Sequence, residues 1–203
     1  MLGLPISTEI RKIITKKKVY EQFGAEMNAE RRKKFDADIA RMVLTNEVSP
    51  VSVNLPAGET VQSLFVLQVF LKAKSFDPQN IAYLAKLFGQ RLVLVLEAES
   101  CQRIAVWQTR LIMTDWEVPG ARTLSLNGLD LDKAWANIVA QIAGINLGQD
   151  AALDEQLART EQRERLQKEI ARLEKKARAE KQPKRKLELA QKVKHLREAL
   201  ISE

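Results

Sequence analysis

The spacing of hydrophobic residues predicts two helices at the start of the chain. Isoleucines and a tyrosine recur at helical spacing between about residue 8 and residue 22, so a first helix is expected there, ending before Gly24. A second and more polar helix is expected from about Asn28, and a run of four basic residues, 31–34, lies near its middle.

Three strand-like segments follow these helices. Residues 39–45 form the first, with a helix as the rival interpretation. Residues 51–55 alternate between apolar and polar side chains, which predicts a second strand that ends at the turn of residues 56–58. Residues 64–71 are dense in leucine, phenylalanine and valine, as expected of a central strand.

Two later helices are indicated by their start signals. Asp77 can cap a helix that has Pro78 at its first position, where an N–H would have no partner in any case, and Gly89 is expected to end it. Asp130 starts another helix. Its apolar residues recur at intervals of four, three and four: Leu131, Trp135, Ile138 and Ile142.

The segment between these two helices is typical of a β-hairpin. Residues 92–96 predict a buried strand, and a turn near residues 99–100 leads into a partner strand over residues 103–111. We also consider a short strand near residues 123–126. Strands and helices do not alternate regularly, so the fold class we expect is α+β, with a mixed β-sheet body and flanking helices.

The C-terminal segment predicts a separate unit. Two glycines bracket a short linker at residues 144–148, so we divide the chain into a body of residues 1–148 and a basic helical hairpin of residues 149–203. Apolar residues repeat at intervals of four, three and four on each side of Pro183, which indicates an antiparallel, coiled-coil-like hairpin with its tip near residues 181–185. The two series are Leu166, Ile170, Leu173 and Ala177, then Leu189, Val193, Leu196 and Leu200.

Positive charge is concentrated in that C-terminal segment. The 33 Lys and Arg exceed the 26 Asp and Glu by 7. Residues 1–150 contribute 18 − 16 = +2, and residues 151–203 contribute 15 − 10 = +5. A solvated, salt-bridged helix surface is one interpretation, and contact with phosphate or a protein partner is the other. The candidate contact residues are Lys16, Lys17, Lys18, Lys181, Lys184, Arg185 and Lys186.

Few residues are suited to catalysis. One cysteine, Cys101, and one histidine, His195, provide too few ligands for a structural zinc site, and one cysteine forms no internal disulfide. No phosphate-cradling or dinucleotide-binding glycine motif is present. The tryptophans at 107, 116 and 135 fit core positions. We therefore expect no catalytic residues, no cofactor and no metal ion.

A nuclease is the enzymatic alternative. The order helix, three strands, helix and strand resembles a nuclease core that binds magnesium through Asp and a Glu-x-Lys motif. No acid stands two residues before Lys72, and Asp38, Glu47 and Glu59 are isolated candidates. The start of the chain has no secretory signal and the longest apolar run has five residues, so we expect a cytoplasmic protein that does not enter a membrane.

Several short motifs, in order, resemble the prokaryotic family called domain of unknown function 4391. They are Leu2–Pro5 with Ser7–Glu9, Lys16–Tyr20, Leu55–Gly58, Gly128–Asp132, Ile142–Gly144, Ile170–Lys176, Glu180–Gln182 and Lys186–Leu189. Pro183 departs from the pattern, because an aromatic residue is expected there.

The resemblance implies a context rather than an activity. Members tend to be encoded beside helicase and DNA-methyltransferase subunits of restriction-like or antiviral defence systems. The expected function is a non-enzymatic accessory subunit that docks onto a larger partner, such as a helicase subunit, through its hairpin. The alternatives are a sequence-nonspecific binder of the DNA or RNA backbone and a metal-dependent or degenerate nuclease.

Overall fold

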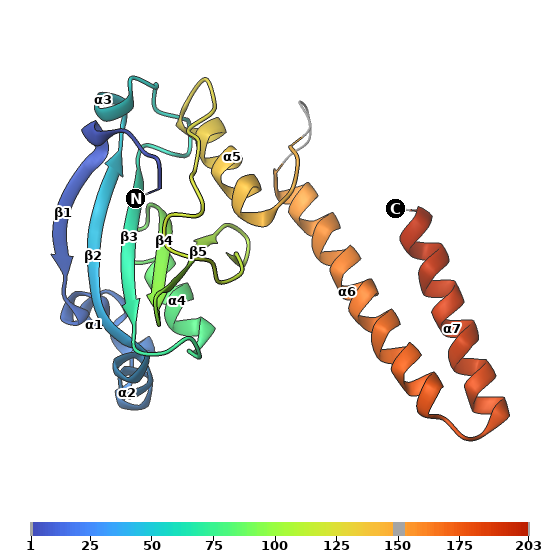
Figure 1. The fold of residues 1–203 in the computed structure, drawn as a ribbon. Coiled ribbons are helices and arrows are strands. Elements are labelled where there is room, and N and C mark those ends of the chain that lie inside the picture. Colours follow the sequence, from blue (N-terminus) through green and yellow to red (C-terminus); the bar gives the residue numbers. More distant parts are fainter. Residues whose placement is uncertain (1, 148–152, 203) are drawn as a thin grey trace. The chain divides into compact units, whose positions relative to one another are not determined.

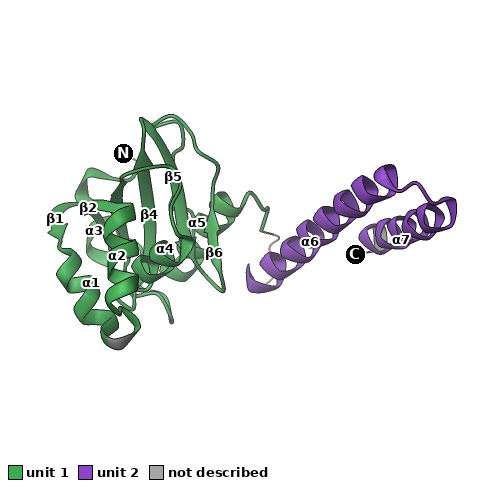
Figure 2. Cartoon of the chain, turned by 90° about the horizontal axis from the view of Figure 1, so that it is seen from below, with its two compact units in different colours: residues 1–148 green, residues 149–203 purple. Residues whose placement is uncertain are grey.

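The computed structural model describes residues 2–147 and 153–202 (Figure 1). The chain divides into two compact units, residues 1–148 and residues 149–203, coloured separately in Figure 2. The first unit contains a six-stranded sheet in which the strands lie side by side in chain order. The strands are β1 Glu9–Ile14, β2 Ile39–Val48, β3 Leu64–Leu71, β4 Arg91–Ala98, β5 Cys101–Trp107 and β6 Leu111–Met113.

The sheet is mixed. β3 and β4 pair parallel, and every other neighbouring pair is antiparallel. A two-residue turn joins β4 to β5, and both of its residues, Glu99 and Ser100, have positive φ, as the tightest hairpin turns require. The predicted α+β class and the predicted β4–β5 hairpin are confirmed.

Helices of the first unit begin at the residues that can cap them. The carboxylate of Asp77 accepts a hydrogen bond from Gln79 N at 2.9 Å, and that of Asp130 accepts one from Lys133 N at 2.8 Å. The helices are α1 Lys16–Phe23, α2 Ala29–Asp38, α3 Pro50–Val53, α4 Pro78–Ala85 and α5 Leu131–Ala143, with short 3₁₀ turns at Ile6–Thr8 and Gly24–Glu26.

The two faces of the sheet are buried by different helices. On one face, α1, α2 and α4 contribute Val19, Phe35 and Ile81 to a core cluster that includes Leu94 of β4. Side chains alternate along a strand, so Arg91, Val93 and Val95 lie on the other face. The Arg91 guanidinium lies 5.5 Å from the ring centre of Trp135, which places α5 on that second face.

The first predicted helix is wrong over its first half. Residues Glu9–Ile14 form the edge strand β1, antiparallel to β2, and the helix begins only at Lys16. β-Branched isoleucines are restricted at χ1 and fit a pleated sheet well. Ile14 is buried and Ile13 is 75% exposed, which is the alternation of a strand rather than the face of a helix.

Four smaller predictions also differ from the structure. Residues 51–55 are not a strand: Ser49 and Ser52 cap each other across the short helix α3, which starts at Pro50. Residues 123–126 do not form a strand, and the second arm of the hairpin ends at Trp107, before a separate strand β6. α4 ends at Ala85, before Gly89.

A single carboxylate fastens the loop after α3 to the start of α5. Asp132 accepts hydrogen bonds from Glu59 N at 2.7 Å, from the Thr60 hydroxyl at 2.7 Å and from Val61 N at 2.8 Å. A Cβ atom at position 58 would lie 2.3 Å from the Asp132 carboxyl carbon, so this close approach requires Gly58. Residues 55–58 and 128–132, two of the motifs quoted for the family resemblance, thus meet at one structural contact.

The second unit is a helical hairpin, as predicted. Helix α6 spans Leu153–Ala179 and helix α7 spans Pro183–Ser202, and the two pack against each other. The seam between them consists of residues from both predicted series: Ile170, Leu173, Leu189, Val193, Leu196 and Leu200. The predicted boundary glycine Gly144 ends α5 in a left-handed conformation, whereas Gly148 lies outside the described residues.

We predict that Asp132→Asn lowers the free energy of unfolding by about 1–3 kcal/mol at pH 7. Hydrogen bonds from Thr60 and from backbone amides lower the pKa of Asp132 below its usual value of 3.8. The stabilisation is therefore present above that value and is lost as the pH falls through the lower folded pKa. Urea unfolding between pH 7 and pH 3 measures it, with the exposed Asp115→Asn as the control. Equal effects of the two substitutions at pH 7 would contradict the contact.

We predict that Val193→Asp unfolds the hairpin, because it places a charge in the apolar seam. The matched control is Leu187→Asp, since Leu187 lies on the same helix and is 61% exposed. Circular dichroism should record a loss of helix for Val193→Asp and little change for the control. Equal helix content in both variants would mean that the seam does not hold the helices together.

Candidate functional site

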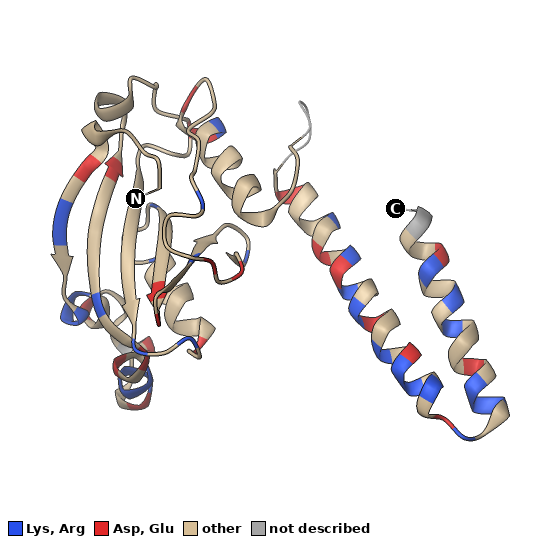
Figure 3. Cartoon of the chain, viewed as in Figure 1, with Lys and Arg blue, Asp and Glu red and all other residues tan. Residues whose placement is uncertain are grey.

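The turn of the hairpin carries a dense cluster of positive charge. Residues 175–186 contain seven basic side chains and one acid, Glu180, a balance of 7 − 1 = +6. Figure 3 shows the basic positions gathering toward this end of α6 and α7. We call these residues the basic tip: Lys175, Lys176, Arg178, Lys181, Lys184, Arg185 and Lys186.

Local hydrogen bonds form the turn without using these cations. The Glu180 carboxylate accepts a hydrogen bond from Gln182 N at 3.0 Å, and Lys186 N donates to Gln182 O at 3.0 Å in the first turn of α7. Pro183 starts that helix, where no N–H is needed. The side chains of the basic tip lie on the surface of the hairpin.

Acidic partners are scarce around the basic tip. Lys181, Lys184, Arg185 and Lys186 form no ion pair with any residue that the structure describes, and Arg178 lies 3.7 Å from Glu174. Residues 168–197 carry 12 − 4 = +8, whereas residues 153–167 carry 3 − 4 = −1. The charge is therefore a property of the distal part of the hairpin.

The three basic candidates on α1 have partners within the first unit. Lys16 forms an ion pair with Asp36 at 2.9 Å, and Lys17 lies 3.6 Å from Glu21. The ammonium of Lys18 lies 4.9 Å from the ring centre of Phe88. These lysines have contacts with described residues that Lys181, Lys184, Arg185 and Lys186 lack, so the two predicted clusters are not equivalent.

Asp36 joins α1 to α2. The Tyr20 hydroxyl donates to the Asp36 carboxylate at 2.7 Å, beside the Lys16 ion pair. Partial burial acts to raise the pKa of Asp36, but the hydrogen bonds from Lys16 and Tyr20 outweigh it and the pKa is lowered. Burial and the hydrogen bond to Asp36 raise the pKa of Tyr20. The family-like motif of residues 16–20 therefore stabilises the body.

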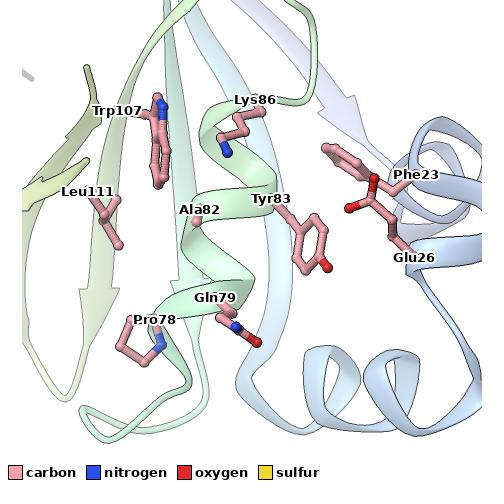
Figure 4. A pocket seen from close by; sticks show the side chains of 9 residues that line it. All are labelled: Phe23, Glu26, Pro78, Gln79, Ala82, Tyr83, Lys86, Trp107 and Leu111. Atoms are coloured by element: carbon pink, nitrogen blue, oxygen red, sulfur yellow. The ribbon is translucent and has the colours of Figure 1, made fainter. Parts of the chain in front are cut away.

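A pocket of about 490 Å³ lies on the outer surface of α4 (Figure 4). Gln79, Ala82 and Lys86, from α4 and the residue that follows it, line its middle. In Figure 4, Trp107 and Leu111 lie on one side of the helix, and Phe23, Glu26 and Tyr83 lie on the other. The Phe23 and Tyr83 rings meet edge to face at 5.0 Å, and the Lys86 ammonium lies 3.7 Å from the Trp107 ring centre.

A second pocket of about 360 Å³ adjoins the first, because Lys86 and Trp107 line both. It adds Thr60, Gln90 and Arg91. Sequence analysis did not identify either pocket, since their residues come from separate segments of the chain. Trp107 was expected in the core, and it is only half-buried.

The residues considered for catalysis from the sequence form no shared site within the described part of either unit. His195 is exposed on α7, and Cys101 is half-buried at the start of β5. Asp38 accepts hydrogen bonds from Asp77 N at 2.8 Å and from the Asn80 side chain at 2.7 Å. Within residues 2–147 and 153–202, no group of three or more His, Cys, Asp or Glu side chains is arranged to hold a metal ion.

A family model described as a domain of unknown function (DUF4391) matches residues 2–200. The chain belongs to this family. The match spans residues of both units, so the body and the hairpin together are what the DUF4391 family shares. No curated protein and no solved structure matches the chain. No helix in the described part of this DUF4391 protein combines the length and the apolar composition that crossing a bilayer requires.

We predict that Lys16→Ala lowers the free energy of unfolding by about 1 kcal/mol, because it removes a partly buried ion pair with Asp36. Lys17→Ala is the control, since its ion pair is solvent-exposed, and its effect should stay within about 0.5 kcal/mol. Urea unfolding of both variants measures the difference. Equal stability of the two variants would mean that the Lys16–Asp36 ion pair does not stabilise the fold. The α1 lysines would then again be candidates for a binding surface.

Proposed function

We propose that this protein is a non-enzymatic accessory subunit that docks onto a larger partner through its C-terminal hairpin. The observation that carries the proposal is the charge of the basic tip, where seven cations face one acid. Such an excess of like charge repels itself, and a complementary acidic surface would relieve that repulsion. Electrostatic complementarity of this kind raises association rates and selects partners.

The construction of the hairpin supports an electrostatic contact rather than an apolar one. Three of its buried residues, Ile170, Leu173 and Val193, pack α6 against α7. Leu187, next to the basic tip, is 61% exposed, but the surface around it is chiefly charged, because all seven cations of the basic tip are exposed. The helical backbone fixes the points from which these side chains extend, so less backbone entropy is lost when a partner binds.

We propose a helicase subunit as the larger partner, in the cytoplasm. This part of the proposal rests on the gene neighbourhood that the family resemblance implies. Family membership supports the choice of context, and the basic tip supports the mode of binding.

The second candidate function is sequence-nonspecific binding to the backbone of DNA or RNA. The same lysines and arginines of the basic tip favour it, because phosphate contacts require no other chemistry. Residues 151–203 contain no Phe, Tyr or Trp, so the hairpin offers a base none of these rings to stack on. Binding at the basic tip would therefore be independent of sequence and steeply dependent on salt.

We predict that replacing Lys181, Lys184, Arg185 and Lys186 by Glu abolishes capture of the larger partner from nuclease-treated cells of the native host. Each substitution changes the charge by −2, so the net charge moves from +7 to −1. The matched control replaces four exposed body cations by Glu and reaches the same net charge: Arg11, Lys12, Lys33 and Lys133.

The comparison separates a local contact from a general effect of charge. Quantitative mass spectrometry should find one large partner with the wild-type protein and the control, and lose it with the tip variant. Retention of the same partner by the tip variant would contradict the proposal. Loss with both variants would mean that net charge, rather than the tip, governs the association.

For the nucleic-acid alternative, we predict a different readout from the same variants. Fluorescence anisotropy with a DNA duplex at increasing salt gives the slope of log affinity against log salt. That slope should fall by roughly 0.9 for each phosphate that the tip variant no longer contacts. A slope that is equal in the tip variant and the wild-type protein would exclude the tip as the duplex-binding surface.

A further inference from the structure

The two pockets on α4 form a second candidate surface, distant in sequence from the hairpin. They adjoin at Lys86 and Trp107, and we call them together the α4 groove. Aromatic rings line the larger pocket, and polar and basic groups line the smaller one. Every lining residue belongs to the first unit, so the groove does not depend on where the hairpin lies.

The aromatic residues of the groove are incompletely buried. Phe23, Tyr83 and Trp107 are all half-buried, whereas Trp135 is only 3% exposed. The indole N–H of Trp135 donates to the Gln108 side chain at 2.7 Å, as a core tryptophan usually does. Trp107 forms no hydrogen bond through its indole N–H with any described residue. The Trp107 ring is thus partly exposed, with the Lys86 ammonium 3.7 Å from its centre.

The groove also carries cations without acidic partners. Lys86 and Arg91 form no ion pair within residues 2–147 and 153–202, and each lies over a tryptophan ring. Glu26 is the single acid that lines the two pockets. Arg31 is already bonded to Asp77 at 2.7 Å. The groove therefore presents positive charge beside half-buried aromatic rings.

We propose that the α4 groove binds single-stranded nucleic acid, with a base stacked on Trp107 and the adjoining phosphates on Lys86 and Arg91. Proteins that bind single strands combine aromatic stacking platforms with a positively charged groove. The larger pocket, at about 490 Å³, falls in the size range of small-ligand sites and admits a base with its sugar. In a duplex the bases are stacked internally, so a duplex cannot supply the base.

The Lys86 ammonium must leave the Trp107 ring for the base to stack. Lys86 is exposed, and a cation–π contact at an exposed site is weaker than the stack of a base on an aromatic ring. The displaced ammonium keeps its charge and remains beside the base, where it can contact the phosphate. Trp107 and Lys86 would thus recognise the base and the phosphate of one nucleotide.

The test uses the full chain and a fluorescently labelled oligo-dT of about 12 nucleotides, within the site size of single-strand binders. We expect Trp107→Ala to lower the affinity about 10-fold or more, and Trp107→Phe to retain most of it, because a phenyl ring still stacks. Lys86→Glu should reduce the salt slope by about 0.7 for each phosphate of the strand that it no longer binds. Lys12→Glu is the matched control, since it makes the same charge change on exposed β1, at the opposite edge of the sheet.

Three results would overturn the proposal. The first is equal oligo-dT affinity of the wild-type protein, Trp107→Ala and Lys86→Glu. The second is equally tight binding of the same strand as a duplex. The third is equally tight binding of poly-glutamate, which has charge but no bases. Each would show that stacking on Trp107 is not the basis of binding.

The basic tip can also attract DNA, so every measurement is repeated in the variant with Glu at residues 181, 184, 185 and 186. The fold-loss caused by Trp107→Ala should be the same in both backgrounds. A tip variant that loses all oligo-dT affinity, while Trp107→Ala and Lys86→Glu have no effect in the wild-type background, rejects the groove and leaves the proposed function of the hairpin intact.

Discussion

The parallel pairing of β3 with β4 is the constraint on which the body depends. Two parallel neighbours cannot be joined by a tight turn, so the chain must cross one face of the sheet between them. Residues 72–90 make this crossing and include α4. The inner side of α4 buries Ile81 and Leu84 in the core, and its outer side provides the middle of the α4 groove. One strand pairing thus determines both the core and the exposed surface of this helix.

The hairpin follows a separate physical plan. Six of its apolar residues form the α6–α7 seam, and its cations are concentrated where the two helices meet the turn. The α6–α7 seam determines how the two helices pack, and the basic tip determines the surface charge of the hairpin. Substitutions at the two places therefore have distinct effects. This separation fits the interaction role that we propose for a small unit with few buried residues. In our proposals, the hairpin docks onto the larger partner and the α4 groove of the body binds single-stranded nucleic acid.

Much of the fold was predictable where a local signal decides the structure. Asp77 and Pro78 specify the start of α4 through capping alone, and the repeat around Pro183 specifies the hairpin. The error at residues 9–14 has a different origin, because an isoleucine spacing that suits a helix also suits an edge strand. Pairing with β2, some 30 residues later, decides between the two. The sequence of residues 9–14 alone does not predict that pairing.

The two candidate sites also differ in how far the sequence predicts them. Charge density along residues 175–186 is visible in the sequence, whereas the α4 groove is assembled from segments that only the fold brings together. Sequence reasoning also treated the α1 lysines and the tip lysines alike. The structure separates them, because Lys16 pairs with Asp36. The segments 55–58 and 128–132, which carry two of the motifs quoted for the family resemblance, meet in a packing contact between Gly58 and Asp132.

We propose that the hairpin by itself carries the interaction, and a transplant of the hairpin provides the test. Residues 149–203 are fused to an unrelated carrier protein, helix content is checked by circular dichroism, and partners are captured from nuclease-treated host cells. Our account predicts that the fusion captures the same large partner as the full chain and that residues 1–148 do not. Capture by residues 1–148 and none by the fusion would contradict it.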